Sequence, residues 1–184
     1  MLAAYIKETG PIENIIVGEL PRPTPGPDEV LVKVQAVALN PIDLYVRSGL
    51  VPFPLSFPYI LGCDFAGRVQ EVGANCKQFK PGDRVWGSNQ GLLGRQGTAA
   101  EYAAIEEQWL YPTPALLPDE KAAAMAMVGL TAHIGLFVRG QLKEGETVYV
   151  PGGSGGVGSM VVQMAKAVGA RVATSAGHPD RIEL

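Results

Sequence analysis

A glycine-rich segment, GGSGGVG at Gly152–Gly158, holds the residues whose types and spacing point most directly to chemistry. Gly153, Gly155 and Gly158 match the pattern G-x-G-x-x-G, which is a weak signal by itself. Without β-carbons, the chain can turn tightly at the first glycine, approach a diphosphate at the second and pack a helix against a sheet at the third. The segment therefore predicts a dinucleotide-binding loop; the alternative is a structural turn that binds nothing.

The flanking segments are those that a dinucleotide-binding loop requires. An apolar strand is expected over Glu146–Pro151, an apolar helix over Val157–Val168 and a second apolar strand over Arg171–Ala176. Two strands with a helix between them form a parallel, right-handed βαβ unit. The N-terminus of such a helix presents unpaired N–H groups and a partial positive charge to an anion. We therefore expect the first half of a doubly wound parallel sheet.

The end of the second expected strand bears on the choice of cofactor. A site for NAD usually carries Asp or Glu about 20 residues after the motif, where it binds the ribose 2′-hydroxyl. Gly177 stands nineteen residues after Gly158, and Thr174–Gly177 contains no carboxylate. Arg181 follows, and arginine pairs with phosphate through two hydrogen bonds. NADPH is therefore expected; the alternatives are that Arg181 is a solvated charge and that Asp180 turns back to a ribose.

The chain before this unit reads as a β domain. The prolines of PRPTPGP, at Pro21–Pro27, predict a surface turn because proline cannot donate to a strand ladder. A helical segment is expected over Asp119–Val138, with a break at Gly129. The predicted division is therefore a β domain at 1–120 and the opening of an α/β domain at 121–184. Strands are expected at Leu2–Lys7, Asn14–Leu20, Glu29–Leu39, Ala66–Val72, Lys80–Trp86, Thr98–Ile105 and Gln108–Tyr111.

Composition excludes several classes of partner. Hydrophobic residues make up 47% of the 184 residues, charged residues 18%, and the net charge is −3. A nucleic-acid or anionic-membrane partner would favour a basic patch, so neither is expected. Cys63 and Cys76 are too few for a disulfide framework and are expected to be reduced. No signal peptide and no stretch near the ~20 apolar residues of a membrane span are expected, which predicts a cytoplasmic protein.

Several blocks occur in a characteristic order along the chain. Together they resemble the medium-chain dehydrogenase/reductase family, and most closely its zinc-free quinone oxidoreductase branch, which includes zeta-crystallin. The resemblance covers nearly the whole chain. The blocks are Asn40-Pro41-Ile42-Asp43, Arg47-Ser48-Gly49, Gly62–Val69 with Val72-Gly73, Lys80–Val85, Gly129–Ala132, and the glycine segment with Gln163 and Lys166.

The resemblance implies a GroES-like β domain joined to a Rossmann domain, and an enzyme that reduces a quinone, enone or alkenal with NADPH. Asn40, Asp43 and Tyr45 would line the substrate side, and family members often form homodimers. From the residues themselves, Asn40 could instead cap a helix starting at Pro41, Tyr45 could be a packing aromatic and Asp43 could fix Arg47. With the motif, the cofactor-binding residues expected are Thr131, Gly153, Ser154, Gly155, Gly156, Val157, Gly158, Ser175, Gly177 and Arg181.

No zinc is expected. Zinc-dependent relatives carry a thiolate where Asn40 stands and a histidine where Cys63 stands. The four Cys and His residues of the chain show no spacing typical of a structural site. Cys63 is expected to be a small buried residue rather than a reactive thiol.

The resemblance also implies a longer protein, because family members are nearly twice this length. The chain is expected to be a fragment or a half-protein that needs a partner. A catalytically inactive nucleotide-binding or structural fragment of this fold is therefore the alternative to an enzyme.

Overall fold

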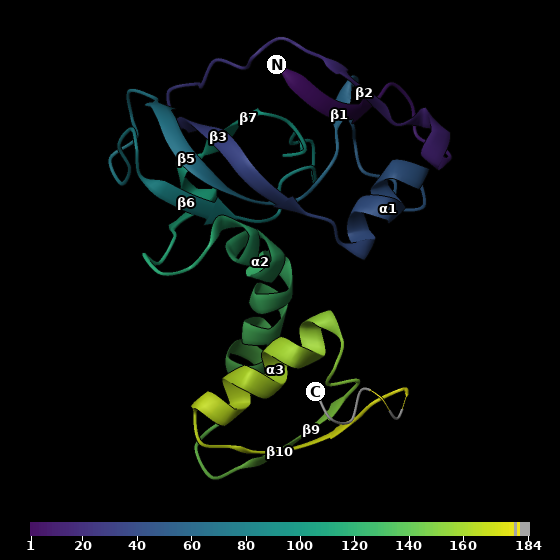
Figure 1. The fold of residues 1–184 in the computed structure, drawn as a ribbon, viewed down its shortest axis with the longest axis vertical. Coiled ribbons are helices and arrows are strands. Elements are labelled where there is room, and N and C mark those ends of the chain that lie inside the picture. Colours follow the sequence, from purple (N-terminus) through teal and green to yellow (C-terminus); the bar gives the residue numbers. More distant parts are fainter. Residues whose placement is uncertain (179, 181–184) are drawn as a thin grey trace. The chain divides into compact units, whose positions relative to one another are not determined.

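A computed structural model describes residues 1–178 and 180 of the chain (Figure 1). The chain divides into two compact units, Met1–Ala126 and Met127–Leu184. The boundary between them falls within helix α2, Asp119–His133. The predicted domain limits near residue 120 stay a prediction.

The first unit is built around a five-stranded antiparallel sheet with the strand order β7-β3-β5-β6-β8. The long strand β3 alternates apolar and polar residues and pairs with β5 and β7. Its side chains Val30 and Val32 are fully buried in a core with Phe65, Val69 and Val85. The strands are β3 (Glu29–Ala38), β5 (Asp64–Val72), β6 (Arg84–Gly87), β7 (Tyr102–Glu106) and β8 (Leu110–Pro112).

A smaller antiparallel sheet with the order β2-β1-β4 completes the first unit, together with helix α1. A second core holds Ile6, Val46, Tyr59 and Leu61. The two residues of β4 are too few to show an alternating pattern, so the sequence did not predict this strand. The elements are β1 (Leu2–Ile6), η1 (Ile12–Asn14), β2 (Ile16–Glu19), α1 (Pro41–Ser48), β4 (Tyr59–Ile60) and η2 (Glu107–Trp109).

Helix α2 runs through Gly129, so the predicted break there is wrong. The surrounding alanines, methionines and leucines are strong helix formers, and one glycine costs only about 1 kcal/mol in a helix interior. The irregularity comes later, where Ile134–Arg139 (η3) forms a π-helical turn that ends at Gly140.

The helical segment Asp119–Arg139 is long and apolar enough, by length and composition, to cross a membrane. The expectation that no stretch reaches this length is therefore wrong. Core helices of soluble proteins pass the same test, and this segment carries charged residues at both ends. Its length and composition by themselves do not indicate a membrane protein.

The second unit contains the predicted parallel βαβ arrangement, which is confirmed (Figure 1). Strands β9 (Thr147–Pro151) and β10 (Arg171–Ser175) pair in parallel, and α3 (Gly156–Ala167) connects them. Apolar side chains of α3 pack on one face of this strand pair and on η3. The cluster comprises Leu136, Phe137, Leu142, Val148, Val161, Met164, Ala165, Val168, Ala170 and Val172.

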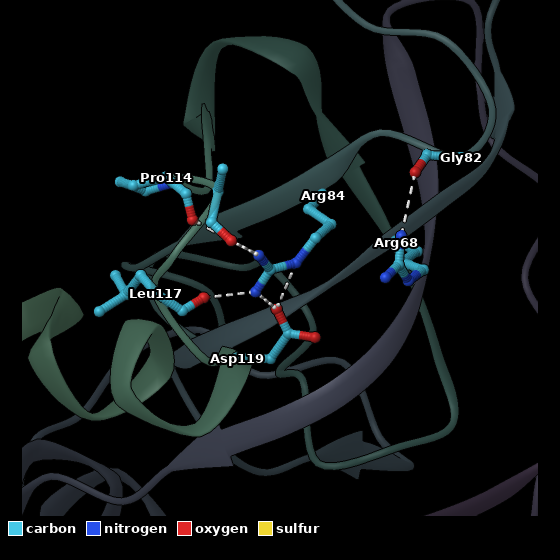
Figure 2. Close-up of polar contacts among 7 residues, drawn as sticks. Arg68, Gly82, Arg84, Pro114, Leu117 and Asp119 are labelled. Carbon is cyan, nitrogen blue, oxygen red and sulfur yellow. Dashed lines mark hydrogen bonds and ion pairs between the residues drawn. The ribbon is translucent and has the colours of Figure 1, made fainter.

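One arginine of the first unit ties a strand to the start of a helix (Figure 2). Nε and Nη2 of Arg84, on β6, both donate to Oδ1 of Asp119, in the first turn of α2. Nη2 also donates to the carbonyl of Leu117, and Nη1 donates to the carbonyls of Pro114 and Ala115. The Arg84 and Asp119 side chains are only 22% and 17% exposed, so water screens the pair weakly. The guanidinium thus holds the connecting segment and the N-terminus of α2 against the sheet.

We expect Arg84→Met to lower the free energy of unfolding by about 2 kcal/mol, because charge-assisted bonds of half-buried groups are lost together. Arg68→Met is the matched control, since Arg68 makes one long bond of 3.4 Å to the Gly82 carbonyl at an exposed position (Figure 2). Urea unfolding monitored by circular dichroism measures both. Equal losses in the two variants would contradict the role assigned to Arg84.

Candidate functional site

The glycine loop has no room for a β-carbon at two of its positions. A β-carbon on Gly153 would lie 2.1 Å from Oγ1 of Thr174, and one on Gly158 would lie 2.2 Å from the carbonyl oxygen of Gly152. At Gly155 the nearest atom, again the Gly152 oxygen, would be 3.2 Å away. The first and third glycines of the motif are therefore required by the packing of the loop itself. The second is the least constrained from within, as expected where an anion approaches.

Backbone hydrogen bonds divide the amides of the loop into two groups. Gly155 N–H donates to Gly152 at 2.9 Å and Ser159 N–H donates to Gly155 at 2.8 Å, which closes the turn and begins the helical ladder. The first-turn amides between them, at Gly156, Val157 and Gly158, precede the helical hydrogen-bond ladder. Their N–H groups point out of the N-terminus of α3, where the helix dipole favours negative charge. This loop can bind a diphosphate.

The end of β10 lies beside the loop. Gly153 N–H donates both to Thr174 Oγ1, at 3.0 Å, and to the Ser175 carbonyl, at 3.1 Å. The Ser175 hydroxyl accepts from the Tyr149 hydroxyl at 3.2 Å. Thr174 was not among the site residues expected from the sequence. Its contact with the loop becomes evident only when β9 and β10 are paired.

The residues that follow β10 carry no carboxylate before Asp180. That carboxylate lies 3.2 Å from Nδ1 of His178, and its side chain is 86% exposed. Among the described residues, no atom lies within 4 Å of the place that a β-carbon on Gly177 would take. Arg181, expected to bind a 2′-phosphate, lies outside the described residues.

Thr131 lies on α2, in the second unit. Its hydroxyl donates to the Met127 carbonyl at 2.7 Å, one turn earlier in the same helix, and the residue is exposed. Its role beside a nicotinamide stays a prediction.

A separate polar cluster lies in the first unit at the start of α1. Asn40 precedes the helix, and its N–H donates to Oδ2 of Asp43 at 2.7 Å, as in a capping box. The Asn40 amide nitrogen lies 2.9 Å from Oδ2 of Asp64 and 3.6 Å from Sγ of Cys63. The Ser88 hydroxyl donates to the other oxygen of Asp64. All five residues are buried.

The structure therefore brings two of the three predicted substrate-side residues together. Asn40 and Asp43 are in direct contact, whereas Tyr45 is 44% exposed farther along α1. The guanidinium of Arg47 donates to the Gly10 carbonyl, which ties the end of α1 to the loop after β1.

Asp64 and Ser88 were missed as site residues. Asp64 stands within a block that carried the family resemblance, and that block was the available signal.

Burial controls the protonation of this cluster. Desolvation raises the pKa of the Asp43 carboxyl, although the Asn40 N–H opposes this rise. Desolvation also raises the pKa of the Cys63 thiol far above its ordinary value, and the neighbouring charges of Asp43 and Asp64 add to this rise. Cys63 is thus held as a neutral thiol and not as a nucleophilic thiolate.

Among residues 1–178 and 180, no group of three or more Cys, His, Asp or Glu side chains could hold a metal ion. The absence of zinc stays a prediction.

We expect the stability of the chain to fall at alkaline pH through Cys63. The raised native pKa means that the folded chain keeps a proton that the unfolded chain loses above its ordinary pKa, near 9. The free energy of unfolding should therefore fall by up to about 1.4 kcal/mol per pH unit as the pH rises through and above that value.

Urea unfolding from about pH 7 to about pH 10 measures this effect, because it spans the ordinary thiol pKa. The stability advantage of the unmodified chain over Cys63→Ala should shrink as the pH rises. Parallel curves for the two proteins would contradict the prediction.

Comparisons with known proteins agree with these features. Residues 26–115 match the family model described as "Alcohol dehydrogenase GroES-like domain". The chain is 36% identical over 181 residues to a quinone oxidoreductase of Pongo abelii, an alignment that covers 98% of this chain and 54% of that protein. The chain thus spans about half the length of the curated relatives that it matches.

Solved structures give the same result. A quinone oxidoreductase of Escherichia coli complexed with NADPH matches with a TM-score of 0.87 and 31% identity, over 100% of this chain and 55% of that one. An NAD-dependent alcohol dehydrogenase matches with a TM-score of 0.92 and 34% identity, over 100% and 60%. The chain combines the GroES-like domain with the first βαβ unit of a Rossmann sheet, and nearly its whole length is similar to quinone oxidoreductases, a branch of the medium-chain dehydrogenase/reductase family.

Proposed function

We propose that the intact natural protein is an oxidoreductase that reduces a quinone, an enone or an alkenal with NADPH and without zinc. The observation that carries the proposal is the glycine loop, which packs without β-carbons at Gly153 and Gly158 and leaves three first-turn amides for a diphosphate. When bound, NADPH supplies the hydride. The chain's own residues bind and orient the cofactor, and they donate hydrogen bonds to the acceptor.

The preference for a 2′-phosphate over a 2′-hydroxyl rests on the end of β10. Ser175 and Gly177 stand where an NAD site would carry a carboxylate. Asp180, the rival for a ribose, lies 3.2 Å from Nδ1 of His178, and its side chain is 86% exposed. A strand end without a fixed negative charge accepts a phosphate at lower electrostatic cost.

The residues proposed to contact the hydride acceptor lie in α1 and at its N-terminus. The Tyr45 hydroxyl is on an exposed side chain and can donate to an acceptor oxygen that gains negative charge. The Asn40 amide nitrogen carries two hydrogens, of which one is directed to Asp64 Oδ2, at 2.9 Å, and the other to the weak acceptor Cys63 Sγ, at 3.6 Å, which an acceptor oxygen would have to replace. Asp43 holds Asn40 through the backbone bond at the start of the helix. We assign Asn40 and Tyr45 as donors, and Asp43 as the residue that orients Asn40.

Zinc-free chemistry is supported by the donor set. The side chain of Asn40 is an amide, which is a poor ligand for zinc, a metal that binds thiolate, imidazole or carboxylate. We also propose a cytoplasmic location, as expected from the sequence, and a homodimer, as the family resemblance implies. Light scattering of the intact protein measures whether it is a dimer.

The intact protein is expected to bind NADPH, seen as a rise of its melting temperature, and to oxidise NADPH when a quinone is added. Thermal protection without turnover would support the alternative, a nucleotide-binding protein without activity. Gly158→Ala should raise the Kd for NADPH about tenfold or more, equivalent to about 1.4 kcal/mol, because its β-carbon displaces the Gly152 carbonyl.

Gly135→Ala is the matched control for that substitution. A β-carbon at Gly135 meets no atom within 4 Å, and Gly135 lies outside the proposed site. Equal affinities of the two variants would contradict the assignment of the loop.

Tyr45→Phe is expected to lower kcat for quinone reduction about tenfold or more, because a hydrogen-bond donor to the developing oxyanion is lost. The Kd for NADPH should stay the same. Tyr111→Phe is the control, since Tyr111 is equally exposed, at 44%, and stacks on Trp86 instead. Loss of kcat in both variants, or in neither, would exclude Tyr45 as the donor.

A further inference from the structure

Thr174, near the end of β10, is the side chain most closely fitted to the glycine loop. Its hydroxyl donates to the Val150 carbonyl at 2.6 Å and accepts from Gly153 N–H at 3.0 Å. The same oxygen occupies the space that a β-carbon on Gly153 would need. One hydroxyl on β10 thus bonds both to the end of β9 and to the start of the loop.

The hydrogen bonds of the Thr174 hydroxyl determine whether it can donate to a phosphate. A hydroxyl has one hydrogen, and here that hydrogen is directed to the Val150 carbonyl. A phosphate only accepts hydrogen bonds at neutral pH unless it is protonated, so Thr174 has no donor to offer it. Ser175 differs, because its hydroxyl accepts from Tyr149 and keeps its hydrogen for another partner.

We propose that Thr174 is a positioning residue for the diphosphate, an inference that rests on the proposed function. It holds the Gly152–Gly153 peptide against β10, and the turn from Gly152 to Gly155 then fixes the direction of the first-turn amides of α3. Thr174 acts through the loop and does not touch the cofactor. Ser175, one residue later, contacts the 2′-phosphate end.

Two small ligands separate these roles in the intact natural protein. ADP carries a diphosphate but no 2′-phosphate, and 2′-AMP carries the 2′-phosphate but no diphosphate. Thr174→Val keeps the shape and removes the hydroxyl; we expect it to raise the Kd for ADP about tenfold, in the range of one lost, partly buried hydrogen bond, and to leave the Kd for 2′-AMP within about twofold. Thr174→Ser keeps the hydroxyl and should restore ADP binding.

Ser175→Ala is expected to show the reverse pattern, with weaker 2′-AMP binding and unchanged ADP binding. Thr174→Ala, which lacks the hydroxyl and relieves any crowding by the second methyl group of valine, should behave as Thr174→Val does. Isothermal titration well below the melting temperature of every variant measures the affinities.

The outcomes are distinguishable. If Thr174→Val and Thr174→Ala bind ADP as the unmodified protein does, or lose ADP and 2′-AMP equally, the positioning role is overturned while the proposed function stands. If the unmodified protein binds neither ligand nor NADPH, the proposed function itself fails.

Discussion

The absence of two β-carbons in the glycine loop is the constraint on which the candidate cofactor site depends. With hydrogen atoms at Gly153 and Gly158, the loop folds back on the Gly152 carbonyl and lies against the end of β10. A close approach of this kind is available only to glycine, because any larger residue would push the loop away from the strand. The direction of the first-turn amides follows from this contact, and the capacity to bind an anion follows from that direction.

The first unit shows a different way of positioning polar groups. Asn40, Asp43, Asp64 and Ser88 are nearly inaccessible to water, and each has a hydrogen-bond partner within the cluster. Burial without such partners would cost several kcal/mol per group in an apolar setting. The partners offset that cost and hold α1 in one orientation, which places Tyr45 on an exposed face. The same burial keeps the Cys63 thiol protonated.

In the function proposed above, the two units divide the tasks of hydride transfer: the second unit offers amides and hydroxyls to a nucleotide, and the first offers donors to an acceptor oxygen. The Arg84–Asp119 pair secures the N-terminal end of α2, the helix within which one unit ends and the other begins. Arg84, Leu117 and Asp119 all belong to the first unit, so these contacts order the start of the helix within that unit by itself.

Local sequence determined the features that depend on neighbouring residues. Glycine spacing, the alternation of β3 and the proline after Asn40 predicted the loop, a half-buried strand and the start of α1, because turn geometry and side-chain periodicity act within a few residues. The same local reasoning placed a break at Gly129, where helix-forming neighbours outweigh one glycine.

Contacts between distant residues were decided only by tertiary structure. Thr174 meets Gly153 because β9 and β10 pair in parallel with Thr174 opposite Val150. Asp64 meets Asn40 because β5 pairs with β3 up to the pair Ala38–Asp64, two residues before Asn40, after two irregularities in register. Register is set by which face of each strand is buried, and that depends on the whole sheet. The identity of the residues that touch the loop and the cap was therefore not contained in any local pattern.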